Sequence, residues 1–136
     1  MVESAGLVII YKNEILLVHP TGAAWRGTYS IPKGEIDDFE SPLHAAIRET
    51  KEEIGIDFSD YLKDYNGNPD GVILYKNGNR VYKKVFYFMV ILNEKPENIM
   101  KNIQYGEVDW AGFIHKDIAK ERIFWRLKPI LEKVFE

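Results

Sequence analysis

The segment from Gly34 to Ile56, GEIDDFESPLHAAIRETKEEIGI, constrains the fold of this chain more than any other part of the sequence. It predicts one amphipathic helix, because Ser41 is a good N-cap, Pro42 suits the first helical position, and Gly55 suits a left-handed C-cap. At about 100° per residue, one face of this helix is apolar and should pack on a core. That apolar stripe consists of Leu43, Ile47, Thr50 and Ile54, with Ala46 at its edge.

The last turns of the predicted helix carry three crowded carboxylates, Glu49, Glu52 and Glu53. Residues three and four positions apart share a helix surface, so these charges repel each other and also oppose the helix dipole. One explanation is a plain acidic face, partly relieved by Arg48 and Lys51. The other is a bound divalent cation, for which oxygen-only ligands favour Mg²⁺ or Mn²⁺. The Pro/Gly turn at residues 31–34 supports the cation, because Gly34 lets the backbone approach and offer its carbonyl.

Length and composition predict one domain, residues 1–136, with a core of ordinary size. No apolar run approaches the roughly 18 residues of a membrane span, and residues 1–4 lack the basic region of a signal peptide. The chain has no cysteine, which excludes disulfides and a thiol nucleophile and fits a cytoplasmic location. The net charge of −3 argues against broad electrostatic binding to nucleic acid.

Apolar runs separated by turns predict an α/β fold with a mixed β-sheet between helices. The expected strands are residues 5–11, 15–19, 29–31, 72–75, 80–92 and 108–114. Asn77-Gly78 predicts a hairpin, and the continuously apolar end of the run 80–92 predicts a central strand covered on both faces. Residues 57–70 predict a long polar loop. A closing helix is expected from Trp125, Leu127, Ile130, Leu131 and Val134, kinked at Pro129 or beginning there.

The spacing within residues 34–56 resembles the Nudix box, the signature of Mg²⁺-dependent hydrolases that cut nucleoside diphosphates linked to another group. The matching residues are Gly34, Glu40, Arg48-Glu49-Thr50, Glu52-Glu53 and Gly55-Ile56. The resemblance implies the α/β/α sandwich of that family over nearly the whole chain. Thr50 departs from the pattern, which prefers an aliphatic residue there, but its methyl group can still pack against a core.

The resemblance also implies roles for single residues. The metal ligands would be Gly34, Glu49, Glu52 and Glu53. The catalytic residues would be Arg48, Glu49, Glu52 and Glu107. Arg48 would orient the carboxylates through charge-assisted hydrogen bonds, and Glu40 would contribute from behind the ligands. Glu107 precedes a predicted strand and is either an ordinary loop residue or a further ligand or base. The general base stays open among Glu49, Glu52 and Glu107.

The residues expected to contact substrate are Arg26, Lys33, Tyr75, Lys83 and Tyr87. Lys33 and Arg26 are candidates for phosphate contacts. Residues 32–34 and 83–88 are similar to features of the diadenosine polyphosphate hydrolases of this family, in which Tyr75 would stack on adenine. Trp25 is either a core aromatic or a border of the same pocket. His19, His44 and His115 lack ligand spacing and predict surface or hydrogen-bonded side chains rather than zinc ligands.

We therefore predict a Mg²⁺-dependent hydrolase, with Mn²⁺ as a substitute, that cuts a diphosphate linkage in a nucleoside polyphosphate such as a dinucleoside polyphosphate. A nucleoside triphosphate or nucleotide-sugar pyrophosphatase is the alternative within the enzyme class. A nucleotide-binding regulatory module without turnover, and an interaction protein with an acidic helix, are the alternatives outside it. We expect a small nucleotide as the partner, and neither a membrane nor a nucleic acid.

Overall fold

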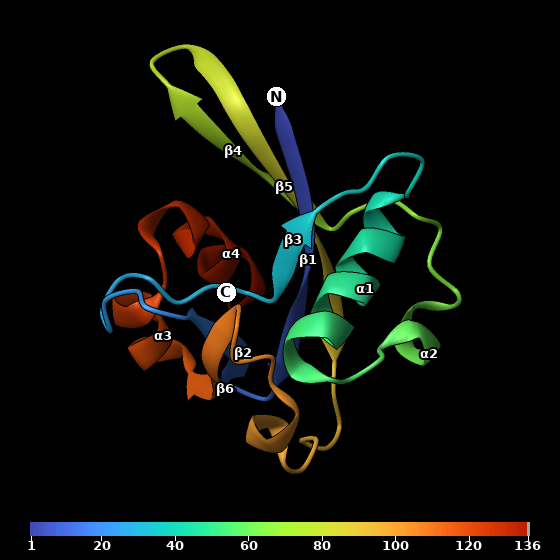
Figure 1. Ribbon diagram of the computed structural model, residues 1–136, viewed down its shortest axis with the longest axis vertical. Helices are drawn as coiled ribbons and strands as arrows, with labels where there is room; N and C mark the ends of the chain where they lie inside the picture. Colours follow the sequence, from blue (N-terminus) through green and yellow to red (C-terminus); the bar gives the residue numbers. More distant parts are fainter. Residues whose placement is uncertain (136) are drawn as a thin grey trace.

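The computed structural model describes residues 1–135, which form a six-stranded mixed sheet with helices on both faces (Figure 1). The strands are β1 (Val2–Tyr11), β2 (Glu14–Pro20), β3 (Lys33–Glu35), β4 (Gly71–Asn77), β5 (Arg80–Ile91) and β6 (Val108–His115). Their order is β4-β5-β1-β2-β6, and β3 pairs with β1 beside this path. The β1–β5 pair is parallel and the other pairs are antiparallel. The predicted mixed sheet is confirmed.

The helices divide between the two faces of the sheet. They are α1 (Pro42–Ile54), α2 (Ser59–Leu62), α3 (Lys116–Arg122) and α4 (Lys128–Val134), with short 3₁₀ helices η1 (Ile99–Asn102) and η2 (Trp125–Leu127). In Figure 1, α1 and α2 lie on one side of the sheet, and α3 and α4 lie on the other. Among residues 1–135, no helix combines the length and apolar character needed to cross a bilayer.

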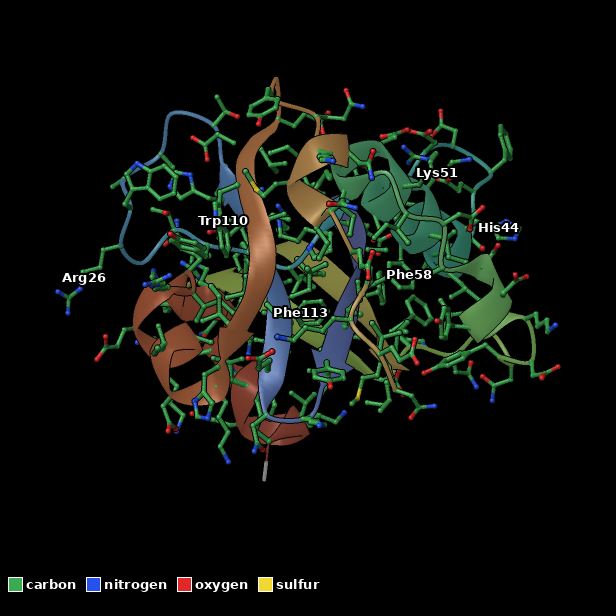
Figure 2. The ribbon with its side chains drawn as sticks, turned by 90° about the horizontal axis from the view of Figure 1, so that it is seen from below. Arg26, His44, Lys51, Phe58, Trp110 and Phe113 are labelled. Carbon is green, nitrogen blue, oxygen red and sulfur yellow. The ribbon has the colours of Figure 1, made fainter. Side chains whose placement is uncertain are left out.

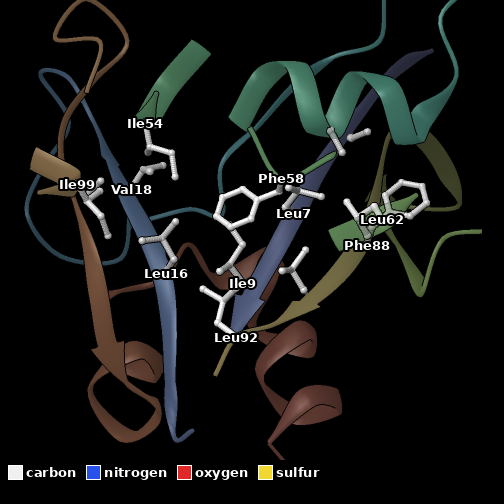
Figure 3. Packing of buried hydrophobic residues seen from close by; sticks show 14 of the residues in the cluster. Leu7, Ile9, Leu16, Val18, Ile54, Phe58, Leu62, Phe88, Leu92 and Ile99 are labelled. Atoms are coloured by element: carbon white, nitrogen blue, oxygen red, sulfur yellow. The ribbon is translucent and has the colours of Figure 1, made fainter. Parts of the chain in front are cut away.

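Two hydrophobic clusters, one on each face, hold the layers together. Leu7 and Ile9 of β1 pack toward α1, whereas Val8 and Ile10 pack toward α3 and α4, because successive side chains of a strand point to opposite faces. Figure 3 shows the cluster beneath α1. The buried half of β5 alternates between the same two clusters, so the prediction of a strand covered on both faces is confirmed.

The segment that leads into the box differs from the prediction. Tyr29 and Ser30 form only isolated bridges, and the strand β3 begins at Lys33, where a turn was expected. Gly6 of β1 makes this pairing possible, because a Cβ at that position would overlap the Pro32 carbonyl and the Lys33 side chain. The cause lies far from the segment in sequence, so a local pattern could not reveal it.

Two other segments also differ from the prediction. The predicted loop 57–70 contains the short helix α2, which buries Leu62. The closing helix begins at Lys128 with Pro129 in its first turn, which agrees with one of the two predicted alternatives, but Trp125, expected on its apolar stripe, lies before it in η2 and is 60% exposed. In α1, Ala45 joins the core face, whereas two residues of the predicted stripe, Leu43 and Ile47, are only partly buried.

Candidate metal centre

The helix α1 has the ends that the sequence predicts, and these ends set the positions of its glutamates. The Ser41 side chain accepts a hydrogen bond from the backbone N–H of His44. Gly55 has a left-handed conformation with φ of 76°, and its N–H donates to the Lys51 carbonyl. Since both ends are capped, the bounds of α1 are fixed, and with them the face on which each glutamate lies.

Three carboxylates converge beside the end of α1. Glu49, Glu53 and Glu107 each offer an oxygen atom, and these atoms lie within 4.8 Å of one another. Glu107 comes from the segment before β6, which is fastened to α1 because the Gln104 N–H donates to the Glu53 carbonyl. The Thr21 N–H donates to the Glu107 carbonyl from another loop. Two elements distant in sequence therefore build one cluster, which we call the carboxylate triad.

The triad carries an electrostatic cost. Burial, together with the neighbouring carboxylates of Glu49 and Glu107, raises the pKa of the Glu53 carboxyl to about 8. Burial likewise raises the pKa of Glu49. A divalent cation would remove this cost, because it neutralises carboxylates that repel each other. The donor set consists of carboxylate oxygens alone, which fits Mg²⁺ or Mn²⁺ and does not fit the nitrogen and sulfur preference of zinc.

Arg48 fixes the carboxylates around the triad. Its guanidinium donates two hydrogen bonds to Glu40, at 2.8 and 2.9 Å, one to Glu49 at 2.9 Å, and one to Glu52 at 3.1 Å. It also donates to the Glu35 carbonyl. The hydrogen bonds from Arg48 lower the pKa of Glu40 to about 2. These are the contacts that the expected orienting role of Arg48 requires, and the roles of Arg48 and Glu40 stay predictions.

Glu52 lies outside the ligand position expected of it, whereas the expected ligand role of the Gly34 carbonyl stays a prediction. Glu52 is bound by Arg48, is about half exposed, and stands outside the triad that residues 1–135 form. Its place among the three carboxylates is taken by Glu107. Gly34 faces Glu49, and a Cβ at position 34 would overlap the Glu49 carboxyl group. Glycine is therefore required because it makes room for this carboxylate.

Lys33 is one of the two residues for which the sequence predicts a phosphate contact. It lies beside the triad. Together with Glu53 and Glu107 it lines a hollow of about 140 Å³. Burial and the adjacent ammonium group of Lys83 lower the pKa of Lys33 to about 8, against the opposing effect of Glu53. The site therefore combines carboxylates that can hold a metal with an ammonium group that can meet a phosphate.

Of the other predicted substrate residues, Lys83 lies beside Lys33, whereas Tyr75, Tyr87 and Arg26 are not gathered at the triad. Tyr75 and Tyr87 are 6% and 2% exposed and belong to the cluster beneath α3 and α4. Because their rings are covered, stacking of adenine on Tyr75 is not supported. Lys83 lies with its Nζ atom 5.2 Å from the centre of the Tyr75 ring. Arg26 is exposed and points away from the body of the protein (Figure 2).

A buried histidine beside these loops has a role that sequence reasoning did not find. The Nε2 atom of His19 lies 2.9 Å from the Ala24 carbonyl, and Nδ1 lies 2.5 Å from the Asp109 carboxylate. Trp25 stacks on the imidazole at 3.6 Å with an angle of 2° between the rings, yet it remains 58% exposed. Trp25 is thus a surface aromatic. The apolar run ILLVH ends in His19. A polar residue at that place indicated a buried polar contact, but the sequence did not identify Asp109 as the partner.

The comparisons with known proteins agree with this geometry. A family model described as the NUDIX domain matches residues 2–134. The m7GpppN-mRNA hydrolase of Saccharomyces cerevisiae is 41% identical over 129 residues, which are 90% of this chain. The chain spans 12% of the length of that yeast protein. The RNA pyrophosphohydrolase of Nitratiruptor sp. is 28% identical over 117 residues, which are 80% of this chain and 72% of that protein.

Solved structures share the fold. The Ap4A hydrolase of C. elegans aligns with a TM-score of 0.71 and 26% identity, covering 98% of this chain and 94% of that chain. A MutT NUDIX hydrolase from Burkholderia pseudomallei aligns with a TM-score of 0.73 over 97% of this chain and 96% of that chain, at 18% identity. Because the family model matches the chain almost from end to end, and the sheet and the glutamate-rich helix have the arrangement described above, this protein belongs to the Nudix hydrolase family.

Proposed function

We propose that this chain is a Mg²⁺-dependent hydrolase of a diphosphate linkage in a nucleoside 5′-polyphosphate. The observation that carries the proposal is the convergence of Glu49, Glu53 and Glu107 beside Lys33. A diphosphate is surrounded by negative oxygens, so its hydrolysis needs neutralised charge and an oriented water molecule. The triad and Lys33 supply both kinds of group.

The triad would hold the metal ion. Mg²⁺, or Mn²⁺ in its place, neutralises phosphate charge and lowers the pKa of water when bound to such oxygens. Arg48 keeps the Glu49 carboxylate turned toward the triad through its hydrogen bond. The room that Gly34 leaves allows that carboxylate to lie against the backbone of β3.

Two carboxylates are placed to accept the proton of the attacking water. Glu52 and Glu107 line the same hollow, of about 290 Å³, together with Gln104 and Gly106. Glu49 is less suited to this step, because it does not line this hollow and Gly34 packs against its carboxylate. We therefore assign proton transfer to Glu52 or Glu107 and phosphate binding to Lys33.

The relatives suggest which nucleotide is cut. The yeast and Nitratiruptor proteins are named for hydrolysis at mRNA caps and RNA, and a solved neighbour is named for Ap4A hydrolysis. We propose the 5′-polyphosphate end of RNA as the first substrate class and a dinucleoside polyphosphate as the second. The expectation that excluded nucleic acid rested on the net charge of −3. Net charge does not describe local groups of cations, such as Lys33 and Lys83 beside the triad.

A substrate panel tests the proposal. It contains 5′-triphosphorylated RNA, capped RNA, diadenosine tetraphosphate, ATP and a nucleotide sugar, each assayed with Mg²⁺, with Mn²⁺ and with a chelator. We expect metal-dependent release of phosphate or nucleotide from one class, lost in Glu53→Gln and kept in the exposed control Glu97→Gln. Binding of nucleotide without turnover of any member would instead identify a regulatory module.

A further inference from the structure

A groove of about 580 Å³, which we call the α1 groove, lies between α1 and the segment that contains α2. Its apolar lining comes from Leu43 and Ile47 of α1 and from Leu62 and Tyr65 of the neighbouring segment. Leu43, Ile47 and Tyr65 are only partly buried by the rest of the chain. A cavity of about 150 Å³ lined by apolar side chains is enough to bind benzene. The α1 groove therefore has room for an aromatic side chain.

The rim of the α1 groove is positively charged. Arg48, Lys51 and Lys63 line it, together with the carboxylate of Asp57. Arg48 is paired with carboxylates beside the triad. No ion pair within residues 1–135 involves Lys51 or Lys63. His44 and Lys51 lie on the side of α1 that faces away from the sheet (Figure 2). The groove is therefore suited to an apolar group that is surrounded by negative charge.

The loop before α1 presents an aromatic side chain that the fold does not use. The Glu40 N–H donates to the Asp37 carbonyl at 3.1 Å, which closes a β-turn with Phe39 in its third position. Phe39 has a φ of 67°, and a positive φ at this position favours glycine. The exposed fraction of Phe39 is 109%, so no packing within residues 1–135 compensates for the strained backbone. A residue that breaks a local rule without such a gain is typical of a functional site.

Phe39 is surrounded by negative charge. Four of the six residues 35–40 are acidic. Arg48 pairs with two of them. The other two, Glu35 and Asp38, take part in no ion pair of the described chain. One chain thus carries an apolar groove with a positive rim and an exposed aromatic side chain on a negative loop.

We propose that the α1 groove binds Phe39 of a second copy of this chain, in a dimer with two-fold symmetry. The groove and the loop both adjoin the first turn of α1 (Figure 1), because Leu43 and His44 line the groove and Phe39 lies three residues before the helix. A single patch can therefore be its own complement, as a two-fold axis requires. Each acidic loop lies against Lys63 of the partner subunit. This inference concerns assembly and does not depend on the proposed function.

Sedimentation of the metal-free protein tests the dimer without any need for turnover. We expect the wild type to pass from monomer to dimer as its concentration rises, and salt to weaken the dimer because salt screens exposed charges. Phe39→Ala should raise the dissociation constant about a hundredfold or more, since an aromatic anchor dominates such an interface and each dimer contains two. Trp125→Ala is the control, because Trp125 is 60% exposed and belongs to η2 on the other face of the sheet. This variant should dimerise as the wild type does.

The melting temperature separates a docking residue from a structural one. Phe39→Gly places glycine where the φ is positive, so it should raise the melting temperature at concentrations where the wild type is monomeric. The same variant should lose the dimer. Phe39 variants that all lower the melting temperature of the monomer would show that the side chain supports the fold, and would overturn the proposal.

Disulfide trapping locates the interface. The chain has no cysteine, so introduced cysteines are its only thiols. A tagged Asp38→Cys chain mixed with an untagged Ser59→Cys chain should form a mixed disulfide under mild oxidation, because Ser59 lines the α1 groove. Asp38→Cys mixed with Trp125→Cys is the matched control and should form none.

Three outcomes would overturn the proposal. They are a wild type that stays monomeric up to about 1 mM, a dimer that Phe39→Ala leaves intact, and equal trapping of Asp38→Cys by both partner variants. The first outcome would reject a second copy as the occupant and would assign the groove to an acidic segment of another protein.

Discussion

The carboxyl group of Glu49 occupies the space that a side chain at Gly34 would fill. The glycine lies in β3 and the glutamate lies in α1, so this contact sets how closely the helix approaches the strand at the triad. The space is open because Gly34 has no Cβ atom. The first prediction follows from this relationship.

Gly34→Ala should reduce kcat/KM by about a hundredfold, the usual effect of displacing a catalytic group by about 1 Å. The added Cβ must push the Glu49 carboxylate away from Glu53 and Glu107. Metal-dependent turnover and the melting temperature are the measurements. Gly106→Ala is the control at the same site, because a Cβ there meets no atom within 4 Å. Full activity in Gly34→Ala would contradict this explanation of the glycine.

Exchanging single glutamates should separate metal binding from proton transfer. Glu107→Gln removes a member of the triad and should raise the Mg²⁺ concentration for half-maximal activity by about tenfold or more, since even residues behind a ligand have effects of that size. Glu52→Gln should leave this concentration nearly unchanged, because Glu52 stands outside the triad. A metal titration of both variants is the measurement. Equal metal dependence in the two variants would refute the assignment of the triad.

The metal-free protein should become less stable as the pH rises from about 5 to 8. The pKa of Glu53 is near 8 in the folded protein and near 4.5 in the unfolded chain, so the folded state retains a proton that the unfolded state loses. Urea unfolding with a chelator, measured at several pH values, reveals the slope. Glu53→Gln should flatten it, and added Mg²⁺ should stabilise the wild type most at the upper end of this range. A slope that persists in the variant would assign the effect to another group.

The Arg48–Glu40 pair should act in the opposite direction and at lower pH. Because Arg48 holds the pKa of Glu40 near 2 in the folded protein, this contribution is present above about 4.5 and is lost as the pH falls toward 2. Arg48→Lys cannot repeat the two hydrogen bonds to Glu40 and should cost about 1–2 kcal/mol of stability at pH 7. Unfolding of the variant between pH 2 and 5 should then vary less with pH than in the wild type.

His19→Gln should loosen the loop that carries Trp25 without removing the metal site. Glutamine keeps a donor for the Ala24 carbonyl but lacks the ring on which Trp25 stacks. Tryptophan fluorescence and hydrogen exchange of residues 20–28 should report the loosening, whereas the Mg²⁺ dependence of activity should stay near that of wild type. Unchanged hydrogen exchange of residues 20–28 in the variant would show that other contacts hold this loop in place.

Local pattern was enough to predict the helix that carries the site. Ser41, Pro42 and Gly55 act on their immediate neighbours, and all three have the predicted roles in α1. The spacing of the box also located Glu49 and Glu53. Their third partner, Glu107, was recognised as a candidate although its neighbourhood in space was unknown, because no local rule brings the segment before β6 to the end of α1.

Contacts between distant segments were the part that the pattern could not supply. The pair His19 and Asp109 is separated by most of the chain, and the start of β3 depends on the missing side chain of Gly6. Tyr75 was expected to stack on adenine because of the family resemblance, but in β4, paired with β5, it lies in the core. Burial of that kind is decided by the layers that cover a strand.

The parallel pairing of β1 with β5 also has a consequence for synthesis on the ribosome. The register runs from Val2 with Lys83 to Ile10 with Ile91, so β1 has no partner on this side until a segment far along the chain has been made. Pairing between segments so far apart is slow, because a long loop must close before the contacts form. Until then the edge of β1 that will face β5 has no paired strand, and the side chains of β1 from Ala5 to Ile10 are apolar or glycine. The pairing of β1 with β5 is therefore expected to form late in folding, after β1 has paired with β2 and β3.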